Sequence, residues 1–198
     1  MLSKKELKYY AVMAAESFAD DPVYTACIKN RFFRKRLLYN FMYLRLNASN
    51  LTAEDIMIED AQKRGLCVWK KASNGLTKKE IFACSKWLNL IFYAAPLSKM
   101  MRAFADADMS VFEGNTLLLS PIFVDKKYQG RGVAKALVSD SARELSAKGF
   151  RLGLETQNKN NILIYNKMGF ELVKNEKYLN GKITNYFMIY NPNFNSVG

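Results

Sequence analysis

The chain has 198 residues, of which 49% are hydrophobic and 24% charged, as is typical of a globular protein with one core. No apolar run approaches the ~20 residues that a membrane-spanning helix requires, and the charged first ten residues do not resemble a signal peptide. The sequence contains no histidine, which excludes Ser-His and Cys-His dyads and the commonest zinc ligand.

The three cysteines, Cys27, Cys67 and Cys84, lie singly among apolar residues and do not have the spacing of metal ligands. An odd number of isolated cysteines is typical of buried thiols in a reducing compartment. We therefore expect a cytoplasmic protein without a bound metal ion and without a membrane segment.

The net charge of +12 favours anionic partners such as nucleic acid, acidic lipid or a phosphorylated cofactor, without choosing among them. The densest basic cluster runs from Lys29 to Arg36 and includes Phe32 and Phe33. Its spacing predicts a helix with a basic outer face and an aromatic inner face, which is either a solvated surface or an anion-binding one. No nucleic-acid-reading motif accompanies the charge, so a nucleic-acid-binding module is the weaker alternative.

The first part of the chain predicts helices followed by a hairpin. Apolar residues at helical spacing indicate a helix over Lys4–Phe18, which leaves almost no room for a strand before it. Asp20-Asp21-Pro22 ends this helix and opens the next, and another helical region covers Leu37–Leu46. Residues 55–60 and 66–70 indicate two paired strands.

Residues 72–115 form an insertion that is predicted to be mainly helical. Asn74-Gly75 indicates a turn, and Thr77 with Glu80 forms a capping box for a helix that ends before Pro96. A further helix is expected over residues 97–107.

The second half alternates strands and helices. Leu117–Val124 is a strongly apolar strand in which Pro121 predicts a bulge or a break in pairing. The elements expected after it are a helix at 132–147, a strand at 151–156, a short helix at 160–168 and strands near 170–173 and 182–190. This order predicts an α/β (α+β) fold with a mixed sheet.

A glycine-rich turn, Gln129-Gly130-Arg131-Gly132-Val133-Ala134, joins the apolar strand to an amphipathic helix. Glycines let backbone amides approach a ligand, and the first amides of a helix together with its dipole suit a pyrophosphate. Arg131 and Lys135 can add positive charge. Taken alone, the turn could equally be a simple helix cap, and it matches neither the P-loop nor the dinucleotide-binding pattern.

The turn matches in full the Q/R-x-x-G-x-G/A motif of the GNAT (GCN5-related N-acetyltransferase) superfamily. Asn158 and Asn161 after a strand, and Tyr165 in a short helix closed by Gly169-Phe170, resemble the second signature of that family. The resemblance implies a single N-acetyltransferase domain over residues 1–198, with a CoA-binding core at about 115–175. It also implies a mixed, mostly antiparallel sheet with helices on both faces and a splayed central strand at Leu117–Val124.

The same resemblance implies acetyl-CoA as co-substrate. The backbone of Ile122, Phe123 and Val124 would pair with the pantetheine arm, and Asn158, with Asn161 as second candidate, would bond to it. The residues expected to hold the pyrophosphate are Gln129, Gly130, Arg131, Gly132, Val133 and Ala134.

Tyr165 would lie beside the thioester sulfur and protonate the leaving thiolate, although it could also pack on Phe170. Without histidine, the group that deprotonates the incoming ammonium must be a carboxylate, a water chain or nothing. Glu155 is the first candidate because it lies just before Asn158 on a strand. Other candidates, each of which could instead be structural or solvated, are Glu113, Asp106 and Asp108.

The expected activity is transfer of an acetyl group from acetyl-CoA to an unidentified amine by direct attack. A CoA-binding sensor or scaffold is the alternative, and self-association into a homodimer is left open. Aromatic and methionine residues that could line an acceptor pocket, or simply belong to the core, are Tyr24, Phe32, Phe33, Trp69, Trp87, Tyr93, Met100 and Met101.

Overall fold

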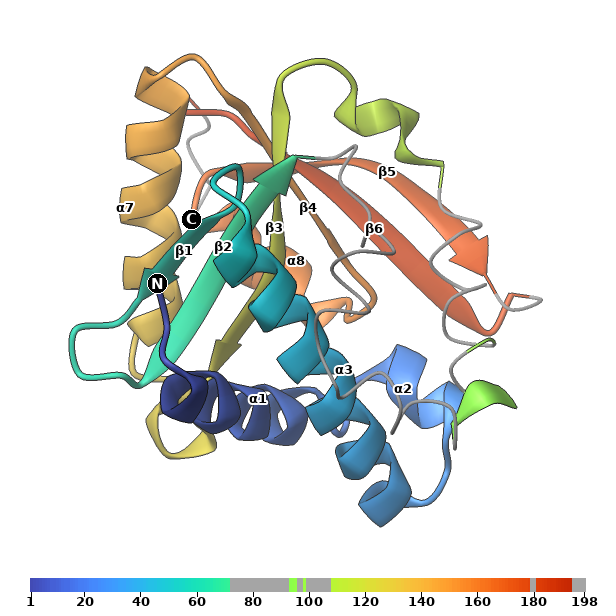
Figure 1. The fold of residues 1–198 in the computed structure, drawn as a ribbon. Coiled ribbons are helices and arrows are strands. Elements are labelled where there is room, and N and C mark those ends of the chain that lie inside the picture. The colour runs from blue at the N-terminus through green and yellow to red at the C-terminus, as the bar shows by residue number, and fades with distance from the viewer. Residues whose placement is uncertain (72–92, 96–97, 99–107, 179–180, 194–198) are drawn as a thin grey trace.

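In the computed structural model, residues 1–71, 93–95, 98, 108–178 and 181–193 are described. Their six strands form one sheet in the order β1-β2-β3-β4-β6-β5, with helices on both sides (Figure 1). The elements are α1 (Lys4–Phe18), α2 (Pro22–Cys27), α3 (Arg31–Leu51), β1 (Ile56–Glu59), β2 (Gly65–Lys71), the 3₁₀ turn η1 (Met109–Phe112), β3 (Thr116–Val124), the 3₁₀ turn η2 (Lys126–Tyr128), α7 (Val133–Ala147), β4 (Arg151–Thr156), α8 (Asn160–Asn166), β5 (Phe170–Tyr178) and β6 (Ile183–Tyr190).

The N-terminal helices begin where the sequence predicts. Ser3 caps α1 in a capping box with Glu6, so no strand precedes this helix in the described part of the chain. Asp21 caps α2 by accepting a hydrogen bond from the backbone N–H of Val23 at 3.0 Å, with Pro22 in the first turn. The predictions for both helix starts are confirmed.

Strand β2 shows how the sheet is buried on both faces. Leu66 and Val68 pack into an apolar cluster with α1, α2 and α3, whereas Cys67 and Trp69 pack into a second cluster with α7. Successive side chains of a strand point to opposite faces, so α1–α3 cover one face and α7 and α8 the other (Figure 1). The antiparallel pairing of β2 with β1 confirms the predicted hairpin.

Strand β3 is paired along its full length on one side only. On the β2 side, pairing continues to Val124, but on the β4 side it stops after Leu118, which lies opposite Gly153. Ser120 and Pro121 together lie opposite the single residue Val68, because Cys67 pairs with Ile122 and Trp69 with Leu119. The predicted bulge and the predicted splay of this strand are both present.

The basic helix is oriented differently from the prediction. Phe32 and Phe33 are exposed, with 68% and 51% of their surface accessible, whereas Arg34 is 5% accessible. Arg34 lies three residues before Leu37 and four before Leu38, so it continues the apolar stripe of α3 toward its N-terminus. The prediction of an aromatic inner face was therefore wrong at this end of the helix.

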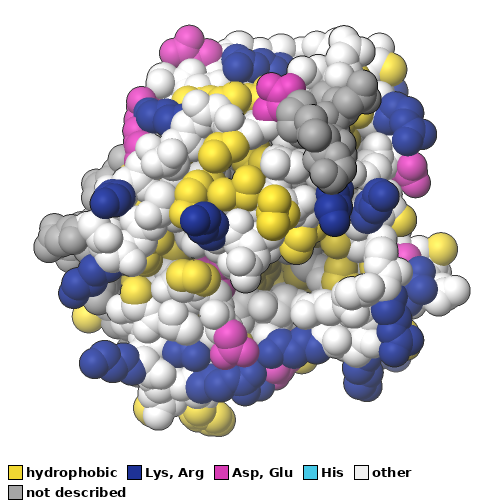
Figure 2. All heavy atoms as spheres, turned by 180° about the vertical axis from the view of Figure 1, so that it is seen from behind, with side chains coloured by type: hydrophobic (Ala, Val, Ile, Leu, Met, Phe, Trp, Pro, Cys, Tyr) yellow, Lys and Arg dark blue, Asp and Glu magenta, His cyan; other side chains and the backbone are white. Residues whose placement is uncertain are grey.

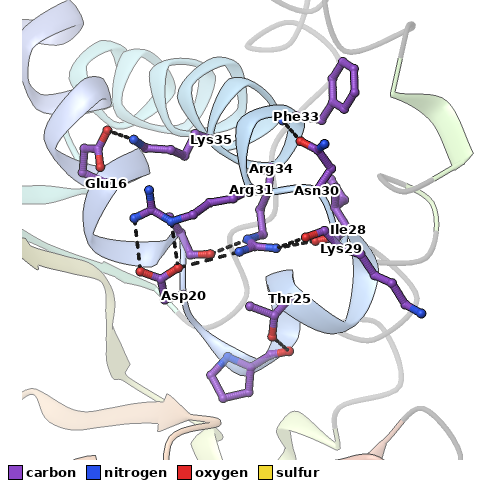
Figure 3. Close-up of polar contacts among 12 residues, drawn as sticks. Glu16, Asp20, Thr25, Ile28, Lys29, Asn30, Arg31, Phe33, Arg34 and Lys35 are labelled. Carbon is purple, nitrogen blue, oxygen red and sulfur yellow. Dashed lines mark hydrogen bonds and ion pairs between the residues drawn. The ribbon is translucent and has the colours of Figure 1, made fainter.

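Buried Arg34 joins three helices (Figure 3). Its guanidinium donates to the backbone carbonyl of Ala19 after α1, and to those of Ile28 (2.5 Å) and Lys29 (3.0 Å) between α2 and α3. Asp20 lies 3.7 Å from the same guanidinium and also pairs with Arg31 and, at 3.2 Å, with Lys126 of η2. This arrangement holds α2 against α3 and ties both helices to the segment that follows β3.

Some expectations lie outside the described residues. The predicted turn at Asn74-Gly75 and most of the helices predicted over 77–107 belong to this group, as do Cys84 and Asp106. Among the helices that are described, none is long and apolar enough to cross a membrane.

We predict that Arg34→Gln destabilises the fold by about 2–4 kcal/mol, because it leaves buried carbonyl groups without their donor. Urea unfolding followed by circular dichroism measures the change. Arg31→Gln is the matched control, because Arg31 shares Asp20 but is exposed, and its midpoint should stay close to that of the wild type. Equal midpoints for the two variants would contradict the role given to Arg34.

Candidate active site

The glycine-rich turn presents free backbone amides at the start of α7. Gly130 and Gly132 have φ values of 74° and 80°, a region that favours glycine. The N–H of Ala136 donates to the carbonyl of Gly132 at 2.9 Å and closes the first turn of the helix. The amides of Val133, Ala134 and Lys135 therefore have no acceptor within the helix, and no side chain caps them. They are suited to a phosphate group.

Side chains of the turn support this geometry. Gln129 donates through its amide nitrogen to the carbonyl oxygen of Val124 at 3.0 Å, which folds the turn back onto the end of β3. The Arg131 guanidinium lies 5.8 Å from the ring centre of Tyr128, and that of Arg64 lies 6.0 Å from the same ring. Gln129 thus shapes the turn with its side chain, while Arg131 keeps its charge at the surface.

The end of β3 has a free backbone edge facing β4. The N–H of Asp125 donates to Arg64 on the β2 side at 2.8 Å, so strand alternation directs the N–H of Val124 to the other side. On that side, pairing with β4 has already stopped, and Ser17 donates to the Val124 carbonyl at 2.8 Å. The N–H groups of Ile122 and Val124 are left for a ligand, whereas the Phe123 side chain is buried against α1.

Asn158 and Asn161 form a small network after β4. The Asn158 side chain accepts from the backbone N–H of Asn160 at 3.1 Å, and the Asn161 amide donates to the Thr156 hydroxyl at 3.0 Å. Each side chain therefore has one internal bond and keeps another polar atom for a ligand. The two predicted binding residues lie together at the start of α8.

Tyr165 lies on the α7 and α8 side of the sheet. Its ring packs edge-on against Phe170, with the ring centres 6.0 Å apart, so the predicted packing contact is present. Burial, followed by the nearby Cys67 thiol, raises the pKa of Tyr165 to about 12. The hydroxyl makes no hydrogen bond with the described residues and is not fully buried. It is a protonated phenol with a free donor.

Glu155 lies on the opposite face, because its neighbour Leu154 packs into the same cluster as Tyr165. One carboxylate oxygen accepts from the Asn185 amide at 2.7 Å, and Gln157 donates to Asn185 at 2.6 Å. Burial raises the pKa of Glu155, although the bond from Asn185 and the charge of Arg45 oppose the rise. The other oxygen has no partner among the described residues and keeps some contact with solvent.

The gap between β3 and β4 thus has a phenol on one face and a carboxylate on the other. Figure 2 views the molecule from behind, where apolar side chains gather around the middle of the surface with Lys and Arg side chains about them. An apolar surface rimmed by positive charge suits a long ligand that carries phosphate groups.

The other candidate bases lie elsewhere. Glu113 is exposed just before β3 begins, at the end of the strand opposite to Val124. Asp108 is exposed and pairs with Lys174 at 2.5 Å. Neither carboxylate reaches the gap, and Asp106 lies outside the described residues.

Sequence reasoning missed Arg45, Ser120 and Asn185, which surround Glu155 on its face of the sheet. Arg45 donates to the Ser120 hydroxyl at 3.2 Å. A signal for Arg45 existed, because it lies four residues after Phe41 and so falls in the apolar stripe of α3. No pattern in the sequence pointed to Asn185 or Ser120.

Comparison with known proteins supports this geometry. A model of the acetyltransferase (GNAT) domain matches residues 99–172. Structures with the same fold include a histone acetyltransferase HPA2 and related acetyltransferase from Corynebacterium glutamicum (15% identity, TM-score 0.62, covering 99% of this chain and 96% of the other). Another is the PaiA N-acetyltransferase from Thermoplasma acidophilum, solved with coenzyme A (15% identity, TM-score 0.55, covering 96% and 94%). A search of curated proteins finds no match.

The turn and the splayed strand lie in or next to the segment, residues 99–172, that matches the acetyltransferase (GNAT) domain, and the solved structures share the fold of the chain. The matched domain is an acetyltransferase domain, one of the two similar structures was solved with coenzyme A, and the comparisons do not identify an acceptor.

We predict that Gly132→Val weakens acetyl-CoA binding by about tenfold or more, because hydrogen bonds to a charged group contribute about 1.5–3 kcal/mol each. A side chain at this positive φ strains the backbone and displaces the amides. Calorimetry with acetyl-CoA measures the loss. Gly149→Val at the other end of α7 is the control, because Gly149 has φ 83° and equally open surroundings, and it should retain affinity. Full affinity in Gly132→Val would count against this phosphate site.

Proposed function

We propose that the chain transfers the acetyl group directly to the amine of a small acceptor across the gap between β3 and β4. Tyr165 acts as the general acid and Glu155 as the general base. The observation that supports this assignment most is their placement on opposite faces of a sheet that is open between them. A base on one face and an acid on the other can serve an amine and a leaving thiolate that lie on opposite sides of one carbonyl group.

Glu155 receives the proton of the acceptor ammonium. One of its carboxylate oxygens keeps contact with solvent, while the bond from Asn185 fixes the position of the other oxygen. Burial raises the pKa of Glu155, which makes its carboxylate a stronger base than that of an exposed glutamate. The freed amine then forms the new bond to the acetyl carbon.

Tyr165 supplies the proton that the departing sulfur needs. Acetyl-CoA contributes the activated acetyl thioester, whose carbon–sulfur bond breaks as the carbon–nitrogen bond forms. With a pKa of about 12, the phenol holds its proton at neutral pH and can donate it to a thiolate. The N–H of Val124, on the open edge of β3, is placed to polarise the acetyl carbonyl.

The binding roles follow the same assignment. The backbone of Ile122, Phe123 and Val124 would run beside the pantetheine arm, with Asn158 and Asn161 at its other side. The turn residues Gln129, Gly130, Arg131, Gly132, Val133 and Ala134 would hold the pyrophosphate.

We further infer that residues 1–198 act as one domain in the cytoplasm. The buried free thiol of Cys67 supports a reducing compartment. Nucleic acid is not the expected partner, and self-association would be tested by the mass in solution.

We predict that Tyr165→Phe lowers turnover by about 10²–10⁴-fold, with little change in acetyl-CoA affinity, because the ring keeps its packing and only the acid is lost. Thiol release from acetyl-CoA gives the rate, and calorimetry gives the affinity. Tyr190→Phe is the matched control, because Tyr190 also packs edge-on against Phe170, at 5.4 Å, and should keep full turnover. Unchanged turnover in Tyr165→Phe would assign the acid to water or the acceptor. If the wild type binds acetyl-CoA but acetylates no amine, the alternative function of a CoA-binding sensor or scaffold is favoured.

We predict that activity rises with pH and is lost as pH falls through the pKa of Glu155, which burial places above that of an ordinary glutamate. No limb from histidine is expected, because the sequence has none. Glu155→Gln should remove the acidic limb from the profile of kcat/KM. Glu171→Gln is the control, because Glu171 also accepts from an asparagine, Asn191, at 2.6 Å. A limb that persists in Glu155→Gln has another source.

A further inference from the structure

Arg45 is a half-buried cation with few partners. It lies on α3, its guanidinium is 5.8 Å from the ring centre of Phe41, and it donates to the Ser120 hydroxyl at 3.2 Å. A guanidinium has five N–H donors, and the bond to Ser120 is its only hydrogen bond or ion pair with the described residues. Most of its donor capacity is therefore unused.

The unused donors are open to a ligand. In the described part of the chain, Asp55 Oδ1 is the only fully buried side-chain nitrogen or oxygen that lacks a hydrogen bond. The unpaired nitrogens of Arg45 therefore keep some contact with solvent. Burial lowers the pKa of Arg45, whereas Tyr24, Glu155 and Asp55 raise it from beyond ion-pairing distance. The carboxylates of Glu155 and Asp55 balance its charge without occupying its donors.

Arg45 also lies at the proposed site of reaction. Its partner Ser120 belongs to the bulge of β3, immediately after the strand has left β4. Glu155 lies two positions after Gly153, the last residue of β4 that pairs with β3, and therefore points to the same face as Gly153, away from Leu154. Arg45 and Glu155 thus approach the gap from one side, with opposite charges that are not paired to each other.

We propose that the acceptor is a small amino carboxylate, whose carboxylate binds Arg45 while its ammonium gives a proton to Glu155. This inference rests on the proposed function. The planar guanidinium matches a carboxylate through two parallel hydrogen bonds, which an uncharged or purely cationic amine cannot accept. A polyamine would leave the donors of Arg45 unsatisfied and would place like charges together. The products are the N-acetylated amino acid and CoA. Glu155 takes the first proton of the ammonium, Tyr165 protonates the sulfur, and the second proton that the nitrogen loses passes through solvent and restores the phenol.

The test compares α-, β- and γ-amino acids with their primary amides, which lack only the negative charge. Thiol release from acetyl-CoA by the full chain gives kcat/KM for each pair. We expect at least one acid to exceed its amide by about 10–100-fold, as a charge-assisted contact implies. Arg45→Gln should lower kcat/KM for that acid by a similar factor and leave the amide unchanged. Arg45→Lys keeps the positive charge but loses the two parallel N–H donors of the guanidinium, so its kcat/KM for the acid should be intermediate.

Arg143→Gln, on the exposed surface of α7, is the matched control and should behave as wild type. The inference is overturned if amides equal their acids, or if Arg45→Gln and Arg45→Lys lower both members of a pair alike. It is also overturned if no acid is acetylated by a chain that binds acetyl-CoA in calorimetry. If the chain does not bind acetyl-CoA, that result would instead contradict the proposed acetyltransferase function.

Discussion

The short pairing of β3 with β4 is the constraint on which the site depends. Three residues of each strand are paired, and then the bulge at Ser120 and Pro121 turns β3 away while β2 continues to hold it. Backbone N–H groups inside a sheet normally have partners, so an open edge in the middle of a sheet is a place for a ligand to complete the ladder. The turn with Gly130 and Gly132 begins shortly after this edge, so the uncapped amides that we propose to bind the pyrophosphate follow it closely in the chain.

The same divergence explains why two faces of one sheet can serve one reaction. Elsewhere the sheet separates the groups on its two faces, because Leu66 and Val68 pack on one face and Cys67 and Trp69 on the other. Only where β4 has separated from β3 can groups from α8 and from the α2–α3 side act on the same atoms. The helices on the acceptor side are fixed by Arg34, and its neighbour Asp20 also binds Lys126 next to the turn.

Local patterns predicted much of this architecture. The helices, the hairpin, the bulge at Pro121 and the glycine turn follow from periodicity, capping and backbone geometry, all of which act over a few residues. The family motif likewise brought Tyr165 and Asn158 to attention. The apolar stripe of α3 includes Arg45, but its meeting with Ser120 and Asn185 could not be predicted, because it joins α3, β3 and β6 through long-range packing. The inward orientation of Arg34 agrees with the apolar stripe of α3. The prediction was wrong because the hydrophobicity of Phe32 and Phe33 indicates the opposite orientation for this end of the helix.

A gap that is reached from both faces has a kinetic consequence. With the thioester sulfur on the Tyr165 side and the amine on the Glu155 side, neither substrate needs to leave before the other arrives. The acetyl group then passes between two molecules held at the same time, and no acetylated form of the protein has to accumulate. Double-reciprocal plots at several fixed acetyl-CoA concentrations should therefore intersect, in contrast to the parallel lines of a ping-pong sequence.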